Sequence, residues 1–428
     1  SVLTYIDGIY LANPLSMGLD LGELERVEVF RGPQGTEFGQ GTTGGAINLV
    51  TKKPVLGETS GYFEAGYGNY QTVNLRTAMN FPIGDNSAIR ASIQKHSHEG
   101  FAEIKGGAID GYELDDADSI SAKVALLFEP SETFSLLLQG FVHESDQNAA
   151  AQKNIADPNP NPRELTQDYP GIFNLDTETI SLIMEWQISD SLSLKSLSGY
   201  QKLEKEQTTD GDRLTQDTIS IDRLGFFSPD NWDVLPFWDN NSEATSQEIV
   251  LTYRSDSVDW VLGGYYLDHD NFNDFLEATG PAPFSAFASA VANPSVATLP
   301  PFQSVLNFTE KRTVSREDLA LYTQATFRLG DKTAITAGIR WQDEKQTDFG
   351  EQFFGIFGPF SRDTNDEAVT WKLGVDYNIS EESMIYALAS TGWKNGGTNP
   401  GAITGGAILL PVGFEPEEVM ALEIGSRN

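Results

Sequence analysis

Apolar and polar residues alternate along most of the chain from about residue 60 onward, in segments of about ten residues. In the segment 179–189, Ile180, Leu182 and Trp186 lie on one side and Ser181 on the other. The same alternation occurs in the segments 334–342 and 369–379. A period of two residues is typical of a β-strand with one apolar face, and no comparable run has helical periodicity. The pattern therefore predicts an all-β protein.

The connections between these segments alternate between very short turns and long polar loops. Short turns are expected at residues 84–86, 130–132, 190–191, 256–257, 330–331 and 380–382. Long loops are expected at residues 143–176, 205–242 and 274–316. Counting the segments gives about fourteen strands, and the strict short–long alternation is typical of a transmembrane antiparallel β-barrel. A β-sandwich or a propeller is the alternative, but aromatic residues near several strand ends favour the barrel.

The first 55 residues have a different pattern from the rest of the chain. Short strand-like runs at residues 3–11, 24–32 and 45–53 are separated by glycine-rich turns. None of these runs is a long alternating segment. We therefore expect a small separate unit at residues 1–55, followed by a barrel unit at residues 56–428.

A glycine motif in the first unit matches the spacing G-x-G-x-x-G of a dinucleotide-binding turn, with Gly39, Gly41 and Gly44. That motif binds a pyrophosphate only where a strand leads directly into the glycines and a helix begins at the last one. Here the preceding strand-like run ends at Phe30, and the residues after Gly44 favour a short strand. Both flanks argue against a nucleotide site, so we interpret the glycines as turn residues.

The composition excludes several classes of function. The formal net charge is −34, with 62 acidic against 28 basic residues, which argues against nucleic-acid binding. There are no cysteines, so thiolate metal sites and disulfides are impossible. No H-E-x-x-H or G-x-S-x-G motif is present, and no pair of acids has a spacing that singles it out. We therefore expect no enzyme activity and no cofactor, and a soluble β enzyme is the alternative.

The first unit resembles the second half of the plug domain of TonB-dependent outer-membrane receptors. The features that carry the resemblance are Asp7-Gly8, Glu25-Arg26-Val27-Glu28, Arg31-Gly32-Pro33, Phe38-Gly39, Gly44-Gly45 and Ile47-Asn48. The remaining chain is similar to the barrel of the same family, at "YGNYQTVNLR" and from "YALASTGWKNGG" to "LEIGSRN". Barrels of this family have about 22 strands, so the resemblance implies that about eight strands and the first half of the plug are missing. A chain of this extent is not expected to close or to transport unaided.

The resemblance implies a monomeric transporter in the outer membrane of a Gram-negative bacterium, in contact with lipid and lipopolysaccharide. Its implied partners are a scarce small-molecule nutrient and a TonB-type inner-membrane complex that supplies energy. In this family the nutrient is most often a ferric siderophore, with cobalamin, haem and oligosaccharides as alternatives. A passive or adhesive barrel without energy coupling is a further alternative.

By the same resemblance, the loop 11–18 forms the plug apex, where ligand is first held. Asn13, Leu15, Ser16 and Met17 are the expected contacts. The alternative is that this loop only packs against the barrel.

The resemblance also implies that Arg31 is buried and paired with carboxylates of the barrel wall, and Glu423 is the predicted counter-charge. An ordinary surface arginine is the alternative. The expected turn glycines of the plug are Gly32, Gly39, Gly44 and Gly45.

His96 and His98 are two residues apart on a predicted strand and therefore share a face, which we expect to line the lumen. They are weak candidates for a metal site, because two ligands do not complete one. Polar wall residues in contact with water are the alternative, and no metal is expected.

Overall fold

A computed structural model describes residues 2–18, 23–33, 35–36, 42–155, 157–211, 213–214, 233–280, 305–352, 359–398, 403–404, 407–408 and 413–428. Within these residues the regular structure is β-strand, apart from two short 3₁₀ helices, η1 (Pro14–Gly18) and η2 (Gly107–Ile109). No helix in this part of the chain is both long and apolar enough to cross a membrane.

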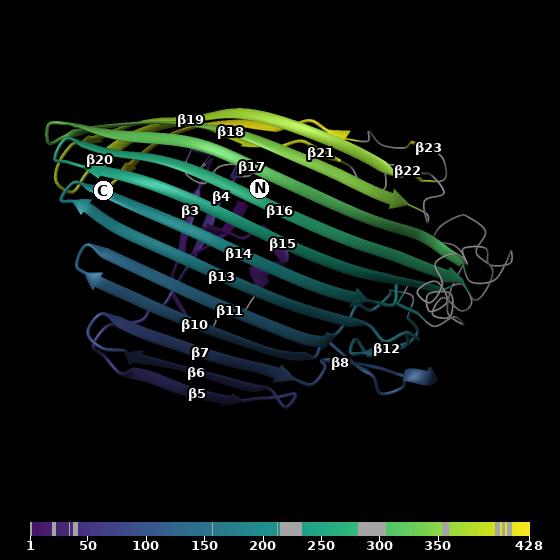
Figure 1. Cartoon of the computed structure of the whole chain (residues 1–428). Helices are drawn as coiled ribbons and strands as arrows, with labels where there is room; N and C mark the ends of the chain where they lie inside the picture. The colour runs from purple at the N-terminus through teal and green to yellow at the C-terminus, as the bar shows by residue number, and fades with distance from the viewer. Residues whose placement is uncertain are drawn as a thin grey trace.

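Fourteen strands form one large sheet in which every neighbouring pair is antiparallel. The strands are β5 (Ser60–Tyr67), β6 (Val73–Pro82), β7 (Ser87–His98), β10 (Ala117–Ser131), β11 (Phe134–Asn148), β13 (Ile172–Ser189), β14 (Leu192–Thr208), β15 (Asp233–Arg254), β16 (Val258–Gly280), β17 (Val305–Leu329), β18 (Thr333–Gln352), β19 (Phe360–Asn378), β20 (Met384–Lys394) and β25 (Glu417–Arg427). They follow one another across the sheet in chain order, from β5 at one edge to β25 at the other (Figure 1). The predicted all-β class and the count of about fourteen strands are confirmed.

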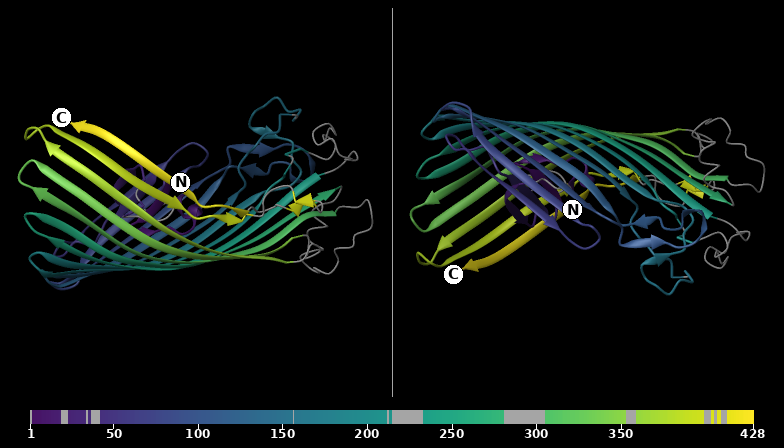
Figure 2. Two further views of the ribbon diagram at one scale, coloured as in Figure 1. Left: turned by 90° about the horizontal axis from the view of Figure 1, so that it is seen from above. Right: turned by 90° about the horizontal axis from the view of Figure 1, so that it is seen from below.

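A second, four-stranded sheet lies on the concave side of the large sheet, which curves around it (Figure 2). Its strands are β1 (Val2–Ile6), β2 (Ile9–Tyr10), β3 (Leu24–Arg31) and β4 (Gly45–Thr51), in the order β2-β1-β4-β3. We call this sheet with its loops the plug, and the concave side of the large sheet the lumen. The chain passes from the plug to the large sheet between Thr51 and Ser60, while the boundary at residue 55 stays a prediction.

The strands of the barrel sheet from β10 to β19 are longer than the sequence pattern predicted. β15, β16 and β17 have 22, 23 and 25 residues, where segments of about ten were expected. The predicted loops 205–242 and 274–316 are wrong in extent, because β14 continues to Thr208 and β17 begins at Val305. The outer part of β17, residues 309–318, is almost entirely polar and has no alternation, yet its backbone still pairs with β16 and β18.

The apolar face that alternation predicted points away from the lumen. Ile180 and Leu182 of β13 are 53% and 38% exposed, whereas Ser181 between them is 8% exposed and faces inward. In β19, Trp371 and Leu373 are likewise exposed on the outer face. An apolar exterior around a polar interior is the reverse of a water-soluble protein and is the arrangement of a barrel in lipid.

Part of the outer connections forms a small covered unit of its own. β8 (Ala102–Ile104) pairs with β9 (Glu113–Leu114) and with β12 (Glu164–Leu165). Ala102, Ile104, Leu114 and Leu165 are almost completely buried between these short strands. This unit lies beyond the end of the barrel sheet that is opposite the short turns (Figure 1).

One buried ion pair fixes the plug to the barrel wall. The Arg90 guanidinium on β7 donates from Nε to Glu23 Oε2 at 2.7 Å and from a terminal nitrogen to Glu23 Oε1 at 2.5 Å. Only 4% of the Glu23 side chain and 12% of the Arg90 side chain are exposed. A bidentate pair in this setting is rigid, and either partner alone would be a buried, uncompensated charge.

We expect Arg90→Ala to loosen the plug, since breaking a buried pair costs about 3–5 kcal/mol. Hydrogen exchange of the β3 and β4 amides, measured by mass spectrometry in detergent, should become faster. Arg26→Ala is the matched control, because Arg26 is half-exposed on the plug and pairs with Glu25 and Glu28. Equal exchange in both variants would contradict the anchoring role.

The outward orientation of β13 gives a second prediction. Leu182→Arg should destabilise the chain in lipid vesicles by about 2–4 kcal/mol, because it places a charge deep in the apolar band. Ile188→Arg, on the same face but next to the short turn at residues 190–191, should cost about 0–1 kcal/mol. Urea titration of vesicle-bound protein measures both values, and equal costs would rule out this depth assignment.

Candidate functional site: the plug and the barrel lumen

The Asp7–Gly8 turn at the end of β1 is the centre of a polar network between plug and wall. Asp7 and Gly8 have φ values of 51° and 89°, which a tight hairpin turn requires and which glycine adopts freely. The Asp7 carboxylate accepts hydrogen bonds from the Thr51 N–H at 2.8 Å and from Gln139 Nε2 at 3.0 Å. Lys123 Nζ on β10 donates to Thr51 Oγ1. One carboxylate therefore connects the hairpin, the end of β4 and the wall strand β11.

The predicted apex loop follows this hairpin and contacts the wall. Asn13 is 8% exposed, and its Nδ2 donates to Asn240 Oδ1 on β15 at 3.1 Å. Ser16 is buried, whereas Leu15 is 38% exposed. The Met17 side chain lies outside the described part of the structure. Asn13 thus serves as a wall contact, and ligand binding by this loop stays a prediction.

The two members of the predicted plug–barrel ion pair, Arg31 and Glu423, lie on β3 of the plug and on β25 of the barrel sheet. Arg31 is the last residue of β3 and is exposed, so the expected burial is wrong. Glu423 lies on the edge strand β25 and accepts a hydrogen bond from Tyr386 Oη at 2.6 Å. Their mutual pairing stays a prediction. Glu23 and Arg90 form a buried pair between plug and wall, and no sequence pattern singled out either residue.

The predicted turn glycines differ in what their positions require. Gly32 has a φ of 74°, which strains other residue types. At Gly45, φ is 141° and an added Cβ would lie 2.2 Å from the Phe30 carbonyl oxygen, so the neighbouring strand excludes a side chain. Gly44 precedes β4 in a bend, and Gly39 lies outside the described residues.

The two histidines share one face of β7, with ring centroids 5.4 Å apart. His96 Nδ1 is 2.5 Å from Asn74 Oδ1, and His98 Nδ1 is 2.8 Å from the Glu99 carbonyl oxygen. Among the described residues, no group of three or more His, Cys, Asp or Glu side chains could hold a metal ion. The pair therefore gains no third ligand from this part of the chain.

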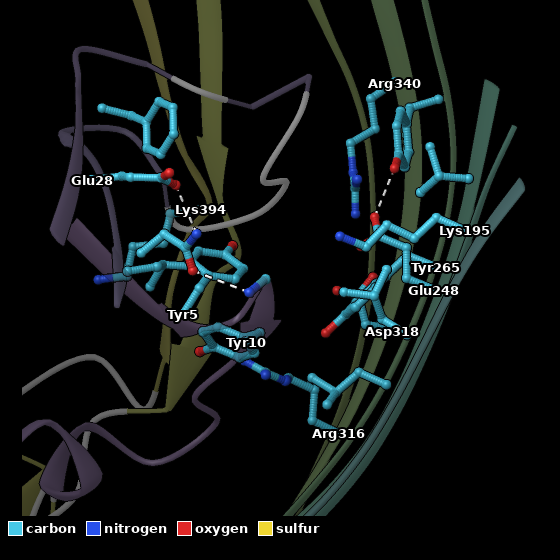
Figure 3. Close-up of a pocket in the computed structure, with 18 of the residues that line it drawn as sticks. Tyr5, Tyr10, Glu28, Lys195, Glu248, Tyr265, Arg316, Asp318, Arg340 and Lys394 are labelled. Atoms are coloured by element: carbon cyan, nitrogen blue, oxygen red, sulfur yellow. Dashed lines mark hydrogen bonds between the residues drawn. The ribbon is translucent and has the colours of Figure 1, made fainter. Parts of the chain in front are cut away.

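A cavity of about 420 Å³ lies deeper, between the plug and the wall strands β14–β18 (Figure 3). From the plug, Tyr5, Tyr10 and Glu28 line it. From the opposite side come Lys195, Glu248, Tyr265, Arg316, Asp318, Tyr322 and Arg340, with Lys394 of β20 nearby. The cavity is within the usual size range of small-molecule sites and is rich in tyrosines and in charges of both signs.

The plug side of the cavity presents the carboxylate of Glu28. Asn48 Nδ2 donates to Glu28 Oε2 at 2.9 Å, and Arg26 Nε donates to Glu28 Oε1 at 2.7 Å. The hydrogen bond from Asn48, followed by that from Arg26, lowers the pKa of Glu28. Burial raises the pKa of Tyr5 well above its usual value, so its hydroxyl stays protonated.

On the wall side, arginines stack with the tyrosines. The Arg340 guanidinium is 5.2 Å from the Tyr322 ring centroid and 5.7 Å from that of Tyr265. Arg316 lies 5.8 Å from the ring centroid of Tyr10, across the gap between wall and plug. Such contacts hold a cation next to an aromatic face without neutralising it.

No sequence pattern singled out these wall residues. Arg316 lay inside a predicted loop, and strand alternation alone does not show which inward positions of five different strands converge. The plug half was easier to find, since Glu28 and Asn48 belong to the motifs that carry the family resemblance.

Two family models match the chain. The TonB-dependent receptor plug domain matches residues 1–46, and the TonB-dependent receptor-like β-barrel matches residues 106–427. The metal-pseudopaline receptor CntO of Pseudomonas aeruginosa is 24% identical over 421 residues, covering 95% of this chain and 54% of that protein. The pesticin receptor of Yersinia pestis is 23% identical over 446 residues, covering 100% and 57%.

Solved structures agree on the fold. The ferric yersiniabactin uptake receptor FyuA of Yersinia pestis superposes with a TM-score of 0.78 at 19% identity, covering 99% of this chain and 60% of that one. The siderophore receptor PiuA of Acinetobacter baumannii gives 0.70 at 17% identity, covering 99% and 62%. The chain spans a little over half the length of these relatives. With family models matched over most of its residues, it belongs to the TonB-dependent receptor family.

Proposed function

We propose that the protein takes part in energy-coupled uptake of a ferric siderophore across the outer membrane of a Gram-negative bacterium. The observation that carries this proposal is a plug sheet held on the lumen side of a barrel sheet by polar contacts. Relatives named as siderophore receptors, FyuA and PiuA, support the choice of ligand. Cobalamin, haem and oligosaccharides are the alternative ligands.

The contacts between plug and wall suggest how uptake would work. The plug is joined to the wall by the Glu23–Arg90 pair and by the hydrogen bonds of Asp7 and Asn13. Polar contacts of this kind can be exchanged for water, whereas the strand pairing of the wall is far more extensive. A TonB-type inner-membrane complex that pulls on the plug would therefore move the plug and leave the wall intact.

Ligand would first be held at the outer side of the plug, by the apex loop with Asn13, Leu15, Ser16 and Met17. Leu15 is 38% exposed, whereas Asn13 and Ser16 are 8% and 9% exposed. In this proposal the outward apolar face contacts lipid and lipopolysaccharide. The protein does not bind nucleic acid. The protein is proposed to be a monomer.

The uptake experiment uses a Gram-negative strain that lacks its own siderophore receptors and expresses the complete reading frame that encodes this chain. Radioactive iron is supplied as ferric yersiniabactin, as ferric catecholates or as ferric hydroxamates, with haemin and cobalamin as the alternative ligands. We expect uptake of at least one ferric siderophore, lost when the strain's tonB gene is deleted. Uptake that persists after the deletion would favour a passive barrel, and uptake of haemin or cobalamin alone would reject the siderophore.

The apex loop is tested with the ligand that the uptake experiment identifies. Leu15→Ala should weaken binding by up to about tenfold, because it removes an accessible apolar contact of about 1–1.5 kcal/mol. Val29→Ala is the control, since Val29 is 63% exposed on β3 of the plug and lies outside the apex. Unchanged affinity in Leu15→Ala would favour the alternative that the loop only packs against the wall.

A further inference from the structure

Two charged side chains of the cavity have polar atoms without partners. Asp318 is 4% exposed, and its Oδ2 accepts a hydrogen bond from Gln342 Nε2 at 2.7 Å. Its Oδ1 is buried and has no hydrogen-bond partner among the described residues. The same holds for Nε of Arg316, two residues earlier on the inward face of β17. Buried polar atoms in this state are rare, and each one needs an explanation.

Four of the other five charged side chains around the cavity, all except Lys394, have partners among the described residues. Lys195 Nζ lies 3.2 Å from Glu185 Oε1, and Glu248 Oε1 accepts a hydrogen bond from Tyr322 Oη at 2.7 Å. Arg340 Nε donates to Gln342 Oε1 at 3.1 Å. Glu28 is held by Asn48 and Arg26, as described above.

Arg316 and Asp318, in contrast, form no ion pair within 4.0 Å with any described residue, although each lies in the electrostatic field of the other. A buried polar atom without a close partner of opposite charge is unfavourable. A ligand that supplied one cationic and one anionic group would satisfy both side chains at once.

Aromatic rings surround these two charges. Tyr5 and Tyr10 of the plug have ring centroids 5.7 Å apart, inclined at 51°. Figure 3 shows Tyr5 and Tyr10 on one side of the cavity and Tyr265 with Asp318 on the other. A flat apolar group between these rings would gain stacking contacts while its charged end reaches β17.

We propose that this cavity is a binding site for a small aromatic zwitterion. Its amine donates to Asp318 Oδ1, its carboxylate accepts from Arg316, and its ring lies among the tyrosines. The site is separate from the apex loop and deeper in the lumen. Its role as a station on an uptake route rests on the proposed function, but the binding itself does not.

Three probes of matched shape test the charge requirement on the purified chain in detergent by isothermal titration calorimetry. L-Phenylalanine carries both charges, 2-phenylethylamine only the amine, and 3-phenylpropionate only the carboxylate. We expect L-phenylalanine to bind at least about tenfold more tightly than either analogue, because each charge-assisted hydrogen bond in a buried site contributes about 1.5–3 kcal/mol. Equal affinities for the three probes, or no binding of any, would overturn the proposal.

Substitutions assign each charge to its partner. In Asp318→Asn, L-phenylalanine should bind no more tightly than 3-phenylpropionate, which lacks the amine. In Arg316→Gln, L-phenylalanine should bind no more tightly than 2-phenylethylamine, which lacks the carboxylate. In Arg316→Lys, L-phenylalanine should still bind somewhat more tightly than 2-phenylethylamine, because the positive charge is kept. Asp270→Asn, an exposed carboxylate on the outward face of β16, is the matched control and should change nothing. If Asp318→Asn and Arg316→Gln both changed the affinity for L-phenylalanine relative to the same analogue, the assignment of the amine to Asp318 and of the carboxylate to Arg316 would be refuted.

A second measurement avoids changing either charge. The chain has no cysteine, so Val250→Cys places a single thiol at the cavity wall. Saturating L-phenylalanine should slow its labelling by a maleimide several-fold, and an unchanged rate would overturn the proposal. Failure of siderophore uptake in cells would reject the proposed function and leave these binding results standing.

Discussion

The reversed polarity of the barrel sheet is the constraint on which the rest of the structure depends. Strand pairing satisfies the backbone, so one face can contact lipid while the other carries polar side chains such as Gln139, Ser181 and Gln201. A polar lumen can hold a plug that is itself bound through hydrogen bonds and ion pairs. A lumen of apolar side chains would instead hold the plug through a continuous core.

The plug depends on this polar lumen for its attachment. Its turn residue Asp7 and its buried Glu23 find their partners on the wall strands β11 and β7. The apolar contact between plug and wall is small by comparison, as in the cluster of Ala12, Ala244 and Leu267. The two sheets therefore differ in how they are held: the barrel by long ladders of backbone hydrogen bonds, and the plug by a few side chains.

The same principle explains the charges of the central cavity. A wall that tolerates buried Asp318 and Arg340, with the half-buried Arg316, on inward positions can recognise charged groups, which an apolar cavity would exclude. The tyrosines of plug and wall make the site two-sided, so its shape depends on where the plug lies. Any movement of β1 and β2 changes the positions of Tyr5 and Tyr10, and therefore changes the shape of the binding surface.

The sequence by itself determined the all-β class, the number of strands and the outward apolar face, because period-two alternation is a local property of each strand. The family resemblance also singled out Asp7–Gly8 and Gly45, and the structure shows that larger side chains would be strained or excluded at both glycines. The sequence pattern underestimated strand length at the outer ends, since backbone pairing there continues without any apolar pattern. Only the tertiary structure decided which charges meet: Glu23 reaches Arg90 across 67 residues, and five strands bring the cavity wall together. Those contacts depend on strand register and on the curvature of the sheet, which no local pattern records.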